Sequence, residues 1–89
     1  MINSFRFIPI TLTSYSSSTK SNSSLLACGK SLDQTYYHNG SSSLPAVNDS
    51  VYSDSAGTSA LIVGHYKYTA ASTMQVSSTG VVLSTDLCV

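Results

Sequence analysis

The sequence predicts an all-β protein: a small antiparallel β-sandwich or barrel-like module of five to seven short strands, preceded by an extended N-terminal strand or arm. Three observations favour this fold. Only 9% of the 89 residues are charged and none is Glu, so the residues that usually cover the solvent face of helices are scarce. Twenty Ser and nine Thr suit the outer faces of strands and the turns between them. Short alternating segments are separated by turn signals such as Asn39-Gly40.

Residues 3–13 predict the first strand, because their apolar side chains are aromatic or β-branched and occupy both faces. Pro9 confines this strand to a sheet edge or a bulge. A strand that is apolar on both faces needs cover on both sides, so we expect it to serve as an interface arm. The apolar segment consists of Phe5, Phe7, Ile8, Ile10 and Leu12.

Residues 14–24 contain seven serines, and such a composition is typical of a linker or a long loop. We therefore divide the chain into an N-terminal arm with a Ser-rich linker, residues 1–24, and a small β module, residues 25–89. At this length the module has a thin core and depends on a disulfide, a metal or a partner chain for part of its stability.

Within the module, alternation and β-propensity predict a series of short strands and no helix longer than two turns. The expected strands cover residues 25–28, 34–38, 51–52 and 60–68, followed by a hairpin of 73–76 with 81–83 through the turn 77–80. The predicted core consists of Leu26, Tyr37, Val51, Leu61, Val63, Tyr66, Met74, Val76, Val82 and Leu87.

Cys28 and Cys88 enclose the module, and a disulfide between them would close a loop of about 60 residues. Two alternatives stay open. The cysteines can be free buried thiols, as expected at synthesis in a reducing cytoplasm. They can also bind zinc together with His38 and His65, although closely spaced ligand pairs are missing.

The sequence does not predict an enzyme, and we expect no cofactor or resident metal. It contains no Gly-x-Ser-x-Gly, no Gly-rich phosphate loop and no paired carboxylates. A net charge of zero argues against a nucleic-acid partner. No apolar run reaches the 18–20 residues or so of a membrane span, and the start does not resemble a secretory signal, so we expect synthesis in a cytoplasm.

Six tyrosines form the second distinctive feature of the module and its leader. Tyrosine offers a broad contact area with a polar tip, which suits protein interfaces and sugar rings. Neighbours in a strand point to opposite faces, so one of Tyr36 and Tyr37 is expected at the surface. By the same reasoning, Tyr36 and Tyr66 are candidate receptor or contact residues, while about half of the tyrosines pack the sheet.

The order of motifs from residue 28 to 88 resembles a family of cysteine-bracketed β modules. These occur in fibre, tail and capsid-associated proteins of phages that infect Bacteroidetes-type bacteria, and in surface proteins of those bacteria. The resemblance implies a small β module displayed on a virion or a cell surface, without a catalytic motif. It rests on Tyr36-Tyr37-His38-Asn39-Gly40, Pro45, Val51-Tyr52-Ser53-Asp54, Gly57-Thr58, Leu61, Gly64-His65-Tyr66, Gly80-Val81-Val82 and Cys88.

These observations predict a structural protein of a bacteriophage virion, made in the host cytoplasm, such as a capsid-decoration, head-fibre or tail-associated subunit. The arm would attach it to other virion proteins or to further copies of itself, because low charge suits a subunit whose surface is covered by neighbours. The first alternative is an adhesin module for host attachment that binds a surface glycan through tyrosines. The second is a secreted bacterial surface protein, which would need a signal that the sequence lacks.

Overall fold

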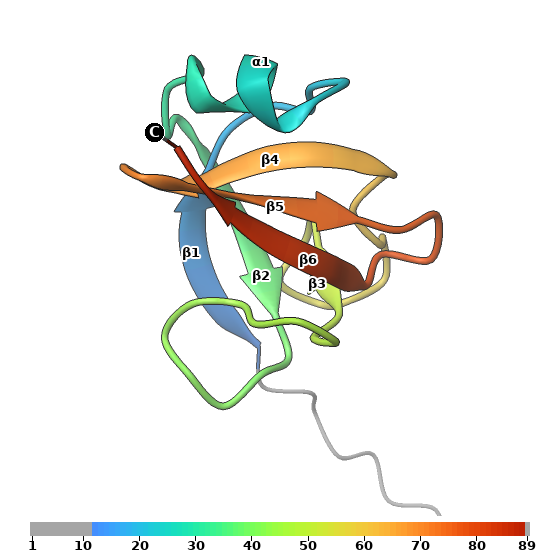
Figure 1. The fold of residues 1–89 in the computed structure, drawn as a ribbon. Helices are drawn as coiled ribbons and strands as arrows, with labels where there is room; N and C mark the ends of the chain where they lie inside the picture. The colour runs from blue at the N-terminus through green and yellow to red at the C-terminus, as the bar shows by residue number, and fades with distance from the viewer. Residues whose placement is uncertain (1–11, 89) are drawn as a thin grey trace, which may run out of the picture.

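The computed structural model describes residues 12–88, which form two three-stranded antiparallel sheets and one short helix (Figure 1). Sheet A has the order β1-β2-β3 and sheet B the order β4-β5-β6. The predicted all-β fold with five to seven strands is confirmed. The elements are β1 (Thr13–Ser17), α1 (Ser24–Cys28), β2 (Gln34–His38), β3 (Val51–Tyr52), β4 (Gly64–Thr69), β5 (Ser72–Val76) and β6 (Val82–Leu87).

Single bridges join the two sheets on both sides, which gives the sandwich a barrel-like form. On one side the chain after β1 reaches β4, where Ser21 and His65 exchange two backbone hydrogen bonds of 2.8 and 3.0 Å. On the other side Ser50, just before β3, bridges to Val81, just before β6. These bridges satisfy edge groups that an open sandwich would expose.

The core lies between the two sheets and is built by cross-strand neighbours. In sheet B, Tyr66 lies opposite Met74, and Val76 lies opposite Val82; all four are fully buried. Val51 of β3 and Leu61 complete the predicted part of the core. Because directly opposed residues share a face, these pairs place their side chains together between the sheets.

Four of the predicted core residues do not belong to the core. Leu26, Val63 and Leu87 are exposed, and Tyr37 is only half-buried. Tyr37 lies opposite Tyr52 and Ser14 on the outer face of sheet A. The alternation identified strands but not which face of each strand is inward, and that choice needs the register.

The Ser-rich stretch is not a linker at its start, because residues 13–17 form strand β1 and pair with β2. The β fold therefore begins at Thr13 instead of at residue 25. Tyr15 is buried in the core, and Ser17 and Ser18 are fully buried. Ser17 Oγ donates to the Lys67 carbonyl at 2.8 Å, and Ser18 Oγ accepts from the Lys67 N–H at 2.9 Å. Serines can be buried at no loss when each hydroxyl has such a partner.

Two further strand predictions are corrected. Residues 24–28 form α1 instead of a strand: Ser23 Oγ accepts from the Leu26 N–H at 3.2 Å and caps the helix, and Ala27 is its buried residue. The strand expected over 60–68 begins only at Gly64. The Leu61 N–H donates to the Val51 carbonyl at 3.0 Å, which draws this segment towards sheet A.

The hairpin of β5 and β6 is confirmed, with its turn at residues 77–80. Gly80 has a φ of +80°, and a Cβ there would lie 2.7 Å from the Ala60 Cβ. Only glycine fits this backbone and this close approach. The turn thereby places Val81 and Val82 against the loop before β3.

Candidate functional site

Three tyrosines meet between the sheets and form the most concentrated aromatic cluster in the described residues. Tyr15 and Tyr36 are opposite each other in sheet A, with ring centroids 6.3 Å apart and an interplanar angle of 66°. Tyr36 contacts Tyr66 of sheet B edge to face, at 5.8 Å and 88°. Edge-to-face aromatic pairs contribute about 0.5–1.5 kcal/mol each beyond their buried area. The cluster therefore fixes how the two sheets face each other.

A hollow of about 340 Å³ opens beside this cluster. Most of the surface that its walls present is apolar. Such a wall suits the apolar face of a ligand or of a partner's side chain. The hollow is lined by Thr19, Lys20, Tyr36, Ser53, Ala60, Leu61, Ile62 and Tyr66.

Lys20 supplies the cation at this hollow, and Gly64 makes room for its stem. A Cβ at Gly64 would lie 2.5 Å from the Lys20 Cγ and 2.9 Å from its Cε. The aliphatic part of Lys20 therefore lies along the start of β4, while its ammonium group can stay in water. In the sequence, Lys20 is distinctive as the single charged residue in the Ser-rich stretch. The interpretation of that stretch as a linker assigned Lys20 no role.

Burial keeps the tyrosines of the cluster neutral. Desolvation raises the pKa of Tyr15 and of Tyr66 far above the usual tyrosine value, and the neighbouring Tyr36 adds to both shifts. Desolvation also raises the pKa of Tyr36, with a smaller contribution from Asp33. Of the three rings, only that of the half-buried Tyr36 can offer aromatic surface outside the core.

The structure brings the two predicted contact tyrosines together, but in different roles. Tyr66 is 1% exposed, and its hydroxyl donates to the Ile62 carbonyl at 2.7 Å. Tyr66 therefore forms the floor of the hollow and cannot offer a free surface ring. Tyr36 is half-buried and presents the rest of its side chain to the hollow. Of the candidate receptor residues, Tyr36 is the one placed to contact a ligand.

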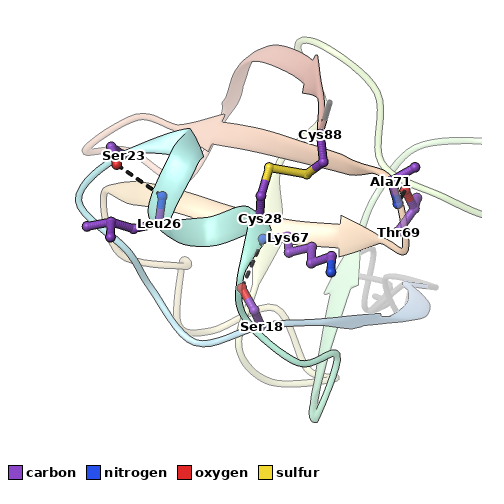
Figure 2. The surroundings of a disulfide bond; sticks show 8 residues. All are labelled: Ser18, Ser23, Leu26, Cys28, Lys67, Thr69, Ala71 and Cys88. Carbon is purple, nitrogen blue, oxygen red and sulfur yellow. Dashed lines mark hydrogen bonds between the residues drawn. A yellow bond between two sulfur atoms is a disulfide. The ribbon is translucent and has the colours of Figure 1, made fainter.

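The candidate disulfide is present in the structure, between Cys28 at the end of α1 and Cys88 just after β6 (Figure 2). Their Cα atoms lie 5.7 Å apart. The bond holds α1 against the end of sheet B, beside Lys67 and the turn from Thr69 to Ala71. Because the cysteines are bonded to each other, neither is a free thiol or a zinc ligand here.

Large apolar side chains are exposed around this disulfide-bonded end and elsewhere. Leu25 is 81% exposed on α1, and Leu87 is 74% exposed next to Cys88. Exposed leucines of this kind mark contact surfaces when they gather on neighbouring elements. The exposed set comprises Leu25, Leu26, Leu32, Leu44, Val47, Ile62, Val63, Leu83 and Leu87.

One serine and one histidine lie side by side where Ser21 bridges to His65. A catalytic histidine needs a partner that orients its second ring nitrogen. In the part of the chain that is described, neither Nδ1 of His65 nor Oγ of Ser21 has a hydrogen-bond partner. Within residues 12–88, no acid is therefore hydrogen-bonded to Nδ1 of His65.

The two histidines lie in separate surroundings. His38 is fully buried on β2, where its Nδ1 accepts from the Gly40 N–H at 3.0 Å and lies 3.8 Å from Asp49 Oδ2. Within residues 12–88, no group of three or more His, Cys, Asp or Glu side chains could hold a metal ion. The same residues contain no helix that is long and apolar enough to cross a membrane.

Of the predicted interface arm, Phe5, Phe7, Ile8 and Ile10 lie outside the described residues. Leu12 is described and lies close to Gly57, where a Cβ would be 3.3 Å from its Cδ1. The same Cβ would lie 3.9 Å from the Tyr52 ring. The apolar segment thus ends at the outer face of sheet A.

Comparisons of the chain with family models, with curated proteins and with solved structures found no match.

Proposed function

We propose that this chain is a structural subunit of a bacteriophage particle, in which the apolar segment attaches to a neighbouring subunit and the β module is displayed. The observation that carries the proposal is the exposure of leucines on α1 and β6 in a protein without net charge. A freely diffusing protein of this kind would tend to associate through these leucines, because no net charge keeps the copies apart. An assembled subunit covers such surfaces with its neighbours.

The phage particle itself is proposed from the resemblance of residues 28–88 to displayed virion modules. The fold is compatible with display, since a disulfide and two sheet-joining bridges stabilise a small module outside the cell. Oxidation after release from the host would complete the disulfide.

The test is made on purified particles of a phage that encodes this chain. We expect its peptides in density-purified particles at a constant ratio to the major capsid protein, and only the disulfide-linked form without reductant. Phe5→Asp with Phe7→Asp should remove the chain from particles, while Leu44→Asp, at an exposed loop residue, serves as the matched control. Finding the chain only in the particle-free lysate would overturn the proposal.

A second candidate function, binding of a host-surface glycan, is favoured by the hollow beside Tyr36. A half-buried tyrosine ring can stack on a sugar, and Thr19, Lys20 and Ser53 can contact its hydroxyls. Tyr37 provides the control, because it points to the opposite face of the same strand. Tyr36→Ala should abolish retention on a glycan array and Tyr37→Ala should not; no retention of the unaltered protein would remove this candidate.

A further inference from the structure

The outer edge of β6 is open from Leu83 to Leu87 in the described part of the chain. On its inner side β6 pairs with β5. At the first residue the outer side is occupied, since the Val82 N–H donates to the Asp49 carbonyl at 2.9 Å and the Val82 carbonyl accepts from the Asn48 N–H at 2.8 Å. Beyond Val82 no such partner is found among residues 12–88. An open edge is a template for pairing with another strand.

The backbone direction shows which residues would form that pairing. The Cys88 N–H donates to the Ala71 carbonyl at 2.6 Å, so Cys88 faces the side of β5. Successive residues of an antiparallel strand direct their backbone groups to alternate sides. Thr85 and Leu87 therefore direct their N–H and C=O groups outwards, towards the open edge.

The side chains along this edge are two leucines, a serine, a threonine and one acid. Thr85 lies opposite the core residue Met74, so Thr85 and Leu87 belong to the face of sheet B that carries the core. Leu87 is exposed on this face, and Leu83 is exposed where the register shifts near the start of β6. Asp86 is exposed and lies on the opposite face, and it is the only charged residue of β6. An incoming strand should thus bring apolar side chains on one face and a positive charge on the other.

The apolar segment has that pattern: Arg6 lies between Phe5 and Phe7 and is the single charged residue of the first 19. We propose that the apolar segment of one copy of this chain adds to the outer edge of β6 of a second copy as an antiparallel strand, with Arg6 opposite Asp86. This inference rests on the proposed function, since it names the partner and the site through which the subunit assembles.

The register that pairs Arg6 with Asp86 also gives the other residues of this edge suitable partners. It sets Phe5 beside Leu87 and Phe7 beside Thr85, so the two rings extend the core face of sheet B. Pro9 then falls opposite Leu83, the extra residue in the shift between the pairs Val76–Val82 and Gln75–Ser84. Proline has no N–H to donate, so it is tolerated where pairing ends or a strand bulges.

The occupant of this edge is the apolar segment of a second copy, so the proposal predicts an assembly of several chains. An apolar segment that paired with β6 of its own chain would leave the protein monomeric, and the mass measured in the test below distinguishes the two arrangements.

A strand donated by one copy to the edge of the next makes a head-to-tail contact. Such contacts close into a ring or continue as a filament, depending on the rotation between copies. Each copy then donates one strand and accepts one strand at its β6 edge. Leu87, next to Cys88, therefore becomes covered along the assembly.

The test exchanges the two charges in the full-length oxidised protein. We expect light scattering behind size-exclusion chromatography to show masses above the 9.4 kDa of one chain. Arg6→Asp and Asp86→Arg each replace an attraction by a repulsion, so each alone should weaken association about tenfold. Arg6 belongs to the apolar segment, and Asp86 is exposed. As a control, Asp33→Arg makes the same charge change as Asp86→Arg at an exposed residue away from the edge of β6.

Mixing the two single variants decides the matter. The arm of either variant is complementary to the edge of the other, so an equal mixture should recover the association of the unaltered protein. A mixture that stays monomeric, or an unaltered protein that is monomeric at every concentration, overturns the inference. If the chain is found in particles but the mixture shows no recovery, this inference fails alone; if the mixture recovers but particles lack the chain, the proposed function fails alone.

Discussion

Sheet A and sheet B contain three strands each, but different kinds of residue hold them together. The strands of sheet B follow one another in the chain as two hairpins, and a disulfide fixes its last strand to α1. The strands of sheet A are separated by α1 and by a loop of twelve residues between His38 and Val51. β3 has only two residues, and β1 lies in the Ser-rich stretch.

The cores of the two sheets differ in the same way. Sheet B contributes Met74, Val76 and Val82, which have no hydrogen-bonding groups, beside a single aromatic residue, Tyr66. Sheet A contributes one aliphatic residue, Val51, beside Tyr15 and the fully buried His38, whose rings lie 5.7 Å apart. Sheet A is also joined to β4 through hydroxyl groups of serines. The comparison teaches that a small fold can replace part of an aliphatic core by aromatic rings and satisfied hydroxyls.

The change with the largest expected effect removes the disulfide, which joins the end of sheet B to α1. Cys28→Ala with Cys88→Ala should lower the free energy of unfolding by about 4 kcal/mol, because the bond closes a loop spanning 60 residues. Urea unfolding followed by circular dichroism measures the change. Reductant should bring the unaltered protein to the same midpoint and leave the double variant unaffected. A double variant as stable as the unaltered protein, or a midpoint of the unaltered protein that reductant does not move, would contradict this prediction.

The second test concerns the serines that join sheet A to sheet B. Ser18→Ala should cost about 1–3 kcal/mol, because the Lys67 N–H loses its acceptor in a buried position. Ser16→Ala on the same stretch is the matched control, since Ser16 is exposed and its substitution should change the unfolding free energy by less than about 0.5 kcal/mol. Equal effects from both substitutions would mean that the stretch is not anchored at Ser18.

Much of sheet B could be predicted from the sequence and much less of sheet A, for physical reasons. Hairpin strands such as those around Met74 and Val82 carry alternation and a turn signal within a few residues. Tyr15 lies among serines, where composition indicates a linker, and only pairing with Tyr36 makes that segment a strand. α1 is too short for a helical period to be recognised, so the sequence predicts a strand where Leu25 and Leu26 lie in a helix.

The candidate site was predicted in part for the same reason. Tyr36, Tyr66 and the two cysteines stand out by residue type, and the structure brings each pair together. Which tyrosine is exposed depends on packing across the two sheets. The sequence predicts Tyr66 both as a core residue and as a candidate contact residue, and the structure shows that it is buried. Lys20 was missed because its contact with Gly64 joins residues 44 positions apart in the chain.

A third test uses one tyrosine from each sheet. Tyr66→Phe should cost about 1 kcal/mol, because it removes the hydrogen bond from the hydroxyl to the Ile62 carbonyl. Tyr15→Phe should be neutral or slightly stabilising, because the Tyr15 hydroxyl is buried and has no partner in the described residues. Both changes keep the ring, so the edge-to-face contacts remain. Equal losses for the two variants would show that the Tyr15 hydroxyl has a partner after all.

The smallest expected effect is a pH dependence at the turn that follows β3 in sheet A. The Asp54 carboxylate accepts hydrogen bonds from the Thr58 hydroxyl and from the N–H groups of Ser59 and Thr58, and these hold the pKa of Asp54 below its usual value. A lowered pKa in the folded state stabilises the fold above the unfolded value of about 3.9, and this contribution is lost as the pH falls through the folded pKa.

Asp54→Asn should therefore lower the thermal midpoint near neutral pH, and the difference from the unaltered protein should disappear in strong acid. The control is Asp33→Asn, which removes an exposed carboxylate that accepts a hydrogen bond from the side chain of its neighbour Gln34. Thermal unfolding at a series of pH values measures both. If the difference between Asp54→Asn and the unaltered protein were constant from neutral pH to strong acid, the turn would owe nothing to the charge of Asp54. The stability of sheet A would then rest on its tyrosines and serines without this ionised cap.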